Sequence, residues 1–236
     1  MYTYAKNNSV AALLAVILIL PFTSYSQSDE NKLGAWYMYF FNGQLNDSRW
    51  GVQGDIQYRN WNLGGDLEQL LIRGGATYKP SNGNVKFTLG YGNVTSGAYG
   101  ESNHTTTEHR IYQEALIPSK LAVRVFVNHR FRFEQRMVEN QNFRTRFRYN
   151  FMINVPLNKK SMESKTWYAS FYNEIFLNAQ RNIGQGKTVE IFDRNRFYLA
   201  LGYVLNNNIK LQFGLMNQTT NAWDKNQLQV GLHQNF

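Results

Sequence analysis

Polar residues, most of them arginine, alternate with apolar residues along two neighbouring segments, 123–136 and 143–155. Successive side chains of a β-strand point to opposite faces, so this period of two predicts strands with one cationic and one apolar face. The polar faces carry Arg124, Asn128, Arg130, Arg132, Glu134 and Arg136, then Arg144, Arg146, Arg148, Asn150 and Asn154. The apolar faces carry Val123, Val125, Val127, His129, Phe131 and Phe133, then Phe143, Phe147, Tyr149, Phe151, Ile153 and Val155.

The same alternation recurs along the chain, whose 16 Phe, 15 Tyr and 5 Trp against 4 Pro form a composition typical of β-structure. It predicts eleven strands, at 33–42, 50–61, 67–79, 85–95, 106–117, 122–136, 142–156, 166–178, 194–205, 209–219 and 225–236. Because single-chain bacterial barrels have even strand numbers, we expect ten or twelve, with twelve favoured. The additional strand would lie within 27–49 or 179–193.

A transmembrane barrel explains these strands better than a soluble β-sandwich or a lipocalin-like barrel. Several segments run for 11 to 15 residues, whereas a tilted membrane-spanning strand needs about 9 to 11 and ordinary strands average about 5 to 6. A soluble core lined with arginine would bury unpaired charge at high cost. Tryptophans near strand ends are expected in interfacial girdles, and they are Trp36, Trp61, Trp167 and Trp223.

Connections of two lengths alternate along the chain. Short turns are predicted at 80–84, 118–120 and 206–208, and longer polar loops at 96–105 and 179–193. Bacterial outer-membrane barrels have short periplasmic turns and long external loops. We therefore expect the two sets to lie at opposite ends of the barrel.

The first 26 residues have the features of a secretory signal peptide. Lys6 supplies a positive charge, residues 10–22 form a short apolar core, and Ser24 and Ser26 place small residues at the two positions that a signal peptidase reads before a cut at Gln27. We expect residues 1–26 to be removed and residues 27–236 to form one barrel domain in the outer membrane of a Gram-negative bacterium. No segment after residue 26 is apolar enough for a spanning helix of about 20 residues.

The C-terminal strand, which ends on Phe236, resembles the signal by which the barrel insertion machinery recognises outer-membrane barrels. Its predicted outer face carries Leu228, Val230, Leu232 and Phe236. Together with the segments NHRFRFEQR (128–136), FRTRFRYNF (143–151), FYNEIFLN (171–178) and DRNRFYLALGY (193–203), this end resembles a family of Bacteroidetes-type outer-membrane barrels, DUF2490, a domain of unknown function. The resemblance covers essentially the whole exported chain. It implies the fold and the location and no activity.

The arginine ladder is the candidate functional feature. Twelve arginines are predicted to face the lumen: Arg59, Arg73, Arg110, Arg124, Arg130, Arg132, Arg136, Arg144, Arg146, Arg148, Arg194 and Arg196. Five carboxylates are available to pair with them, namely Asp55, Glu108, Glu114, Glu134 and Glu174. Cross-strand arginine–carboxylate pairs would brace a narrow bore and give a structural or assembly barrel. The surplus of arginine would instead favour a narrow anion-selective channel or binding barrel.

Other chemistry has weaker support in the sequence. Ser102 and His104 in a loop would fit a rim-site lipid hydrolase, but a catalytic triad is defined by geometry and not by sequence proximity. The chain has no cysteine and only 4 histidines, so no metal-ligand spacing is present and we expect no cofactor or metal. The net charge is +9, yet an exported barrel is expected to meet the lipid bilayer and small anions and no nucleic acid.

Overall fold

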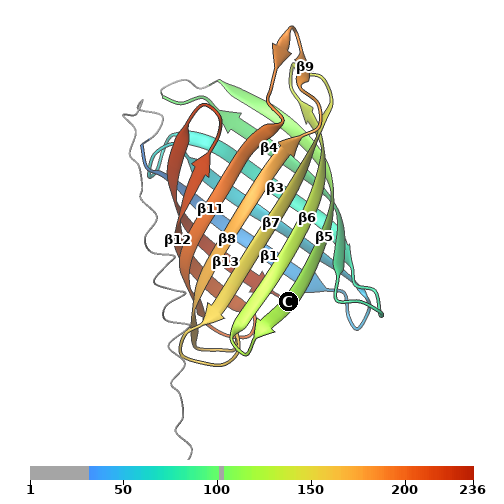
Figure 1. Cartoon of the computed structure of the whole chain (residues 1–236), viewed down its shortest axis with the longest axis vertical. Helices are drawn as coiled ribbons and strands as arrows, with labels where there is room; N and C mark the ends of the chain where they lie inside the picture. The colour runs from blue at the N-terminus through green and yellow to red at the C-terminus, as the bar shows by residue number, and fades with distance from the viewer. Residues whose placement is uncertain (1–31, 101–103) are drawn as a thin grey trace, which may run out of the picture.

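The computed structural model describes residues 32–100 and 104–236, which form one closed β-barrel of eleven strands (Figure 1). The predicted signal peptide and its cleavage site lie outside the described residues. The barrel strands are β1 (Gly34–Gln44), β2 (Trp50–Asn60), β3 (Leu67–Tyr78), β4 (Lys86–Gly97), β5 (Thr105–Ala122), β6 (Val125–Val138), β7 (Arg144–Pro156), β8 (Thr166–Asn178), β11 (Phe192–Val204), β12 (Ile209–Thr219) and β13 (Asp224–Asn235). Among the described residues there is no helix long and apolar enough to span a bilayer.

Each barrel strand pairs antiparallel with its neighbours, except at the seam where β1 meets β13. There Gly34 lies opposite Gln227 and Asn42 opposite Asn235, so the two strands run parallel. An up-and-down barrel with an odd number of strands must close in this way, because its first and last strands point in the same direction. The all-β barrel is confirmed, but the expected even number is wrong and the antiparallel order has this one exception.

The additional strand expected within 179–193 is also wrong for the barrel. That segment forms a separate two-stranded hairpin, β9 (Asn182–Gly184) and β10 (Lys187–Thr188), which projects beyond the barrel end in Figure 1. Its tip turns at Gln185 and Gly186, both with positive φ of 54° and 70°. At residues 32–49 the described chain contains β1 alone.

The connections predicted as short at 80–84 and 206–208 and those predicted as long lie at opposite ends of the barrel, although the β7–β8 connection, 157–165, is longer than these turns and lies at the same end as they do. The turns 79–85 and 205–208 share one end with the C-terminus, and the end of β4, the start of β5 and the β9–β10 hairpin share the other end with the start of β1. The turn predicted at 118–120 is wrong, because β5 continues to Ala122. Pro118 is tolerated there because β4 begins opposite Leu116, so Pro118 lies on an unpaired edge of β5.

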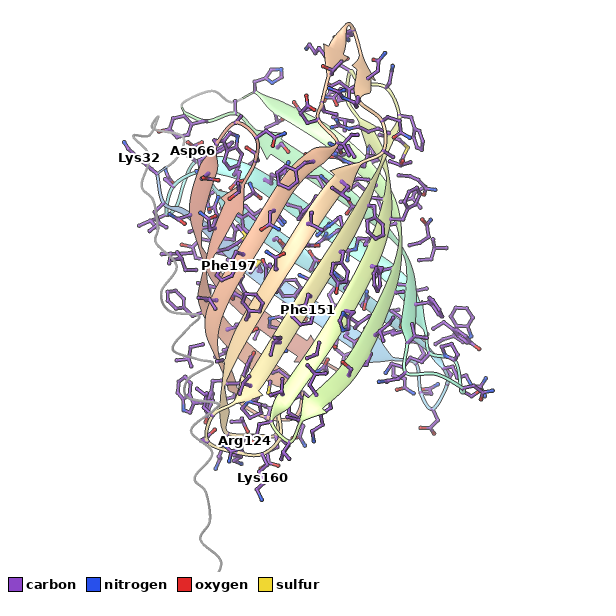
Figure 2. The ribbon with its side chains drawn as sticks, in the orientation of Figure 1. Lys32, Asp66, Arg124, Phe151, Lys160 and Phe197 are labelled. Carbon is purple, nitrogen blue, oxygen red and sulfur yellow. The ribbon has the colours of Figure 1, made fainter. Side chains whose placement is uncertain are left out.

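The barrel wall is apolar outside and charged inside. Along β6, Phe131 and Phe133 are exposed on the outer face while Arg132 and Glu134 are buried in the bore. Figure 2 shows the labelled Phe151 and Phe197 at mid-height on the wall, whereas the labelled charged residues lie at the ends of the strands: Arg124, Lys160, Lys32 and Asp66. The alternation in the sequence therefore maps directly onto the two faces of the wall.

An apolar cluster occupies one side of the bore. Trp36 on β1, Tyr198 on β11 and Met216 on β12 are almost fully buried there, with Tyr172 packed against them. The prediction that Trp36 belongs to an outer girdle is therefore wrong. It lies on the inward face of β1, two residues from Met38, where arginines of two other strands stack on its ring.

Glycines of the wall make room for tyrosines in the bore. A Cβ atom at Gly90 on β4 would overlap the Tyr112 ring, and one at Gly202 on β11 would overlap the Tyr168 ring. These glycines serve close side-chain packing. The glycine-rich stretch around Gly90 is thus part of a strand.

Candidate functional site

Glu134 on β6 is the most buried member of an ionic network that fills the bore, with 1% of its surface exposed. Its Oε2 accepts hydrogen bonds from Nε and Nη2 of Arg146 on β7, at 2.9 and 2.6 Å. Its Oε1 accepts one from Nη1 of Arg148 at 2.6 Å, and Arg132 Nη1 lies 4.0 Å from the same atom. One carboxylate therefore compensates the charge of arginines on two strands, and these bonds are of the strong charge-assisted kind.

Glu108 and Glu114 on β5 repeat this pattern on either side of Glu134. Glu108 accepts bidentate pairs from Arg110 on its own strand and from Arg136 on β6, with donor–acceptor distances of 2.5 to 3.0 Å. Glu114 accepts from Arg132 Nε at 2.7 Å. The planar fork of guanidinium suits such two-point contacts.

Other pairs connect strands that are not neighbours in the wall. Arg130 on β6 reaches over β7 to Glu174 on β8 at 2.8 Å, and Arg148 donates to the same Glu174 oxygen at 2.7 Å. Arg146 reaches over β8 to Asp193 on β11, also at 2.8 Å. These contacts cross part of the bore and tie the wall together from inside.

The opposite wall joins the network through polar side chains. Gln53 on β2 donates to Glu114 on β5 at 3.0 Å, and Gln227 on β13 donates to Glu68 on β3 at 2.9 Å. Asp55 on β2 pairs with Arg73 on β3 at 2.9 Å. Each link extends from one strand to another inside the barrel.

Glu68 and Asp193 are interior carboxylates that the alternation did not predict. Both are the extra residue of a β-bulge: Arg59 and Asn60 pair with Gln69 and Leu67, skipping Glu68, and a similar irregularity skips Asp193 on β11. A bulge re-aims one side chain relative to strict alternation. The sequence signal for Asp193 is its position directly beside Arg194, with which it pairs at 3.0 Å.

The ten charged residues predicted to share the lumen all belong to barrel strands and lie on the inward face. Nine of them are at most 7% exposed, and Arg130, nearest the C-terminal end of the barrel, has a side chain that is 26% exposed. The nine are Arg110, Glu114, Arg132, Glu134, Arg144, Arg146, Arg148, Glu174 and Arg196. The prediction that Arg124 also faces the lumen is wrong, because Arg124 lies exposed in the turn between β5 and β6.

Three of the buried arginines have no carboxylate partner within 4.0 Å among the described residues. Arg59 donates to the side chains of Gln57 and Gln69, and Arg196 donates to Gln218. The Nε atom of the third, Arg144, has no hydrogen-bond partner. Arg144 lies on β7, beside the paired arginines, whereas Arg59 on β2 and Arg196 on β11 lie where the described residues place no carboxylate within 4.0 Å of them.

The bore holds a cavity of about 290 Å³ at the end where the C-terminus lies. Charged side chains line it, among them Asp55, Glu114 and Arg130, together with the stacked rings of Phe40 and His233. Beyond it the network residues are nearly inaccessible to water, so the middle of the bore is filled.

The residues considered for other chemistry lie apart from the network. His109 is on the outer face of β5, where its Nδ1 lies 2.5 Å from the Tyr91 hydroxyl, and His129 contacts Tyr149 in the same way on β6. His104 is in the 98–104 connection, while Ser102 is outside the described residues. No group of three or more metal-ligating side chains forms within the described chain.

The residues of the predicted insertion signal lie on the outer face of the barrel end. Leu228, Val230 and Leu232 point outward from β13 and alternate with the inward Gln227 and Gln229. The ring of Phe236 stacks on Phe41 of β1 at 6.3 Å, and its backbone N–H donates to the Asn42 carbonyl at 3.0 Å. The last residue therefore contributes to the parallel seam.

Comparison with known proteins identifies the family but no close relative of known role. No curated protein and no solved structure matches the chain. The family described as "Protein of unknown function (DUF2490)" matches residues 33–229, which is nearly the whole barrel. The eleven-stranded barrel with its internal arginine–carboxylate network is therefore a member of the DUF2490 family.

Proposed function

We propose that this chain is an outer-membrane barrel of a Gram-negative bacterium, that its bore is closed, and that its role is structural or assembly-related. The observation that carries the proposal is the inverted distribution of side chains. Leu89 and Phe213 on the outer wall are 61% and 57% exposed, whereas Glu134 in the bore is 1% exposed. Water-soluble proteins rarely expose apolar patches of this kind.

The hydrocarbon core of a bilayer would remove this cost. Outward apolar residues occur on strands all around the barrel, including Tyr37, Ile72, Ile111, Phe147 and Leu201. Closure of the barrel pairs the backbone groups of the strands, which a chain in lipid requires. The charged residues labelled in Figure 2 lie at the two ends, where headgroups and water would meet them.

Aromatic pairs at the C-terminal end of the barrel support the same setting. Trp50 packs against Tyr78 with ring centroids 4.9 Å apart, and Trp167 packs against Tyr203 at 4.8 Å, both in a tilted arrangement. Both tryptophans are exposed on the outside near the ends of their strands. Tryptophan and tyrosine favour the interface between hydrocarbon and water.

The ionic network supports a closed bore. A water-filled channel would leave the arginines that line it accessible, yet Arg132, Arg146 and Arg148 are each at most 5% exposed. Their charges are compensated by Glu114, Glu134 and Glu174. A network of this kind fixes the bore and adds cross-links within the wall.

A second candidate is a narrow anion-selective channel, and the arginines without carboxylate partners favour it. Arg59 and Arg196 would attract anions into the bore, as rings of basic residues do in anion pores. Chloride conductance in a planar bilayer would support the channel, and its absence would support the closed barrel.

The location is tested by fractionating cells that express the full chain from its own start. We expect the protein with outer membranes, in a form whose gel mobility changes on heating, and an N-terminus at Gln27. Recovery in the soluble fraction, or membrane-bound protein that retains Met1, would contradict the proposal. Dependence of that recovery on the barrel insertion machinery tests the proposed assembly partner.

A further inference from the structure

A second, smaller cavity of about 40 Å³ lies within the filled part of the bore, and its lining is unusual in charge. Eight arginines line it, contributed by β2, β3, β5, β6, β7 and β11, together with Gln69, Leu71 and Phe176. No carboxylate belongs to the lining among the described residues. Guanidinium groups from six of the eleven barrel strands thus surround one small space.

Most of these arginines have acidic partners placed around the cavity rather than in it. Arg73 pairs with Asp55, Arg110 and Arg136 with Glu108, and Arg146 and Arg148 with Glu134, at distances from 2.5 to 2.9 Å. The carboxylates hold these side chains in place. Arg146 and Arg148 donate from all three of their guanidinium nitrogens to these carboxylates or to Asp193 and Glu174, so they contribute positive charge to the space that the arginines enclose.

Arg59 and Arg196 are different, because no carboxylate lies within 4.0 Å of either among the described residues. Both are buried, at 4% and 6% exposure, and both stack on Trp36, with Cζ lying 3.7 and 4.8 Å from the ring centroid. Two like charges gathered on one indole repel each other. Neutral partners such as Gln57 and Gln218 satisfy some N–H groups but compensate no charge.

A buried cation without a counter-charge is costly, and Arg59 and Arg196 are two such cations in a cavity that six further arginines line, so the cavity selects a negative ligand. We propose that this cavity is a binding site for one small inorganic anion, phosphate or chloride in class, held by Arg59, Arg196 and the surrounding guanidinium groups. The planar guanidinium fork suits an oxyanion. The anion supplies the negative charge that the β2 and β11 side of the network lacks.

The size of the cavity limits what it accepts. A volume of 40 Å³ admits roughly three water molecules, which is the room that a halide or a tetrahedral oxyanion needs. A sugar, a nucleotide or an acyl chain would not fit. The anion is therefore an internal part of the closed bore, and it would neutralise the interior without passing through it.

The test uses purified full-length barrel, folded in detergent in sodium gluconate, whose anion is too large for the cavity. Inorganic phosphate is titrated at constant ionic strength, with chloride as a parallel arm, while the unfolding midpoint is followed by heat-modifiable gel mobility. Above the Kd of the anion that binds, each tenfold rise in its free concentration should raise the unfolding midpoint by about 3 to 6 °C. The arm that responds identifies the class of anion.

The paired variants are Arg59→Gln with Arg196→Gln, and Arg181→Gln as the control. Arg181 forms only an exposed pair with Glu190, so its loss should leave the anion response unchanged. The double variant should lose most of the response. A midpoint that is indifferent to both anions, or an equal response in the double variant, overturns the site.

Diffraction gives a readout that does not depend on the variants folding. Crystals of the unaltered protein soaked in bromide should show an anomalous peak in contact with the guanidinium groups of Arg59 and Arg196. A bore without bromide and phosphate overturns the proposal. The anion site rests on the closed-bore proposal, but the two are tested by different experiments. Conductance tests whether the bore is closed, and anion-dependent unfolding tests whether the cavity binds an anion.

Discussion

Glu134 and Arg146 lie opposite each other on β6 and β7, and Glu134 Oε2 accepts hydrogen bonds from two nitrogens of Arg146. The other oxygen of Glu134 binds Arg148, which lies two residues farther along β7. Like charges directly opposite each other destabilise a strand pair, and Arg132 is directly opposite Arg148 in this sheet. Glu134 therefore offsets a repulsion that the register of β6 and β7 creates.

Replacing Glu134 by glutamine should destabilise the barrel by about 3 to 5 kcal/mol, because it leaves buried arginines without their counter-charge. The measurement is the urea midpoint of unfolding in detergent, followed by tryptophan fluorescence and by heat-modifiable gel mobility. Glu174→Gln should act in the same direction, since Glu174 accepts from both Arg130 and Arg148.

The matched control is Glu163→Gln, which removes a carboxylate from an exposed pair with Lys159 in the β7–β8 connection. Exposed pairs contribute about 0 to 1 kcal/mol, so this midpoint should hardly move. Equal shifts for Glu134→Gln and Glu163→Gln would mean that the interior network does not stabilise the fold.

The positions of the strands could be predicted from the sequence because alternation reports directly which face of a wall a residue occupies. Phe131, Arg132, Phe133 and Glu134 face as their order predicts. The partners of each arginine could not be predicted. Arg130 meets Glu174 only because tilt and register bring β6 and β8 together over β7, and these depend on the whole barrel.

The errors of the sequence prediction have local causes. Glu68 and Asp193 were missed because a β-bulge turns each of them into the bore against the alternation. The sequence analysis predicts an interfacial position for Trp36 because it is near a strand end, but Trp36 lies on the inward face of β1. The alternation itself predicts eleven strands, and the error came from applying the even-number rule of bacterial barrels, which this chain breaks by closing with β1 and β13 parallel.

Substituting alanine for Gly202 should destabilise the barrel by about 1 to 3 kcal/mol, the usual cost of overpacking. The new methyl group would overlap the ring of Tyr168, which is buried in the bore. Gly74→Ala on β3 is the control, because a Cβ there meets no atom within 4 Å. Unfolding midpoints compare the two. If Gly202→Ala is as stable as Gly74→Ala, the tyrosine packing is not restrictive.

The two barrel ends should differ in accessibility in intact cells. A protease site inserted between Gln185 and Gly186 extends the β9–β10 hairpin, and one inserted between Asn207 and Asn208 extends the turn at the C-terminal end. With long loops outside and short turns in the periplasm, added protease should cut only the hairpin site. Both sites should be cut after the outer membrane is permeabilised.

Selective cutting of the 207–208 site in intact cells would contradict the proposed orientation and would mean that the C-terminal end of the barrel is external. In the orientation proposed, β1 begins at Gly34 on the external side, because an odd-stranded barrel separates its two chain ends.

Deleting Phe236 should lower the amount of inserted barrel and leave aggregate in the periplasm. The residue carries the proposed recognition side chain, and it extends the seam by pairing with Asn42 and Gln44 of β1. Quantitative blotting of heat-modifiable protein in outer-membrane fractions measures the loss. Phe236→Tyr, which keeps an aromatic ring, should restore insertion. Unchanged abundance of the deletion variant would exclude a role for this residue.

The closed bore is tested most directly by current measurements on purified barrel reconstituted in a planar lipid bilayer. The prediction is that the unaltered protein conducts no resolvable current in potassium chloride, while Glu134→Gln, if it inserts, conducts at most transiently. A steady chloride-selective current through the unaltered protein would contradict the closed bore. Reversal of that selectivity by Arg132→Glu with Arg146→Glu would establish that the arginine lumen is the path.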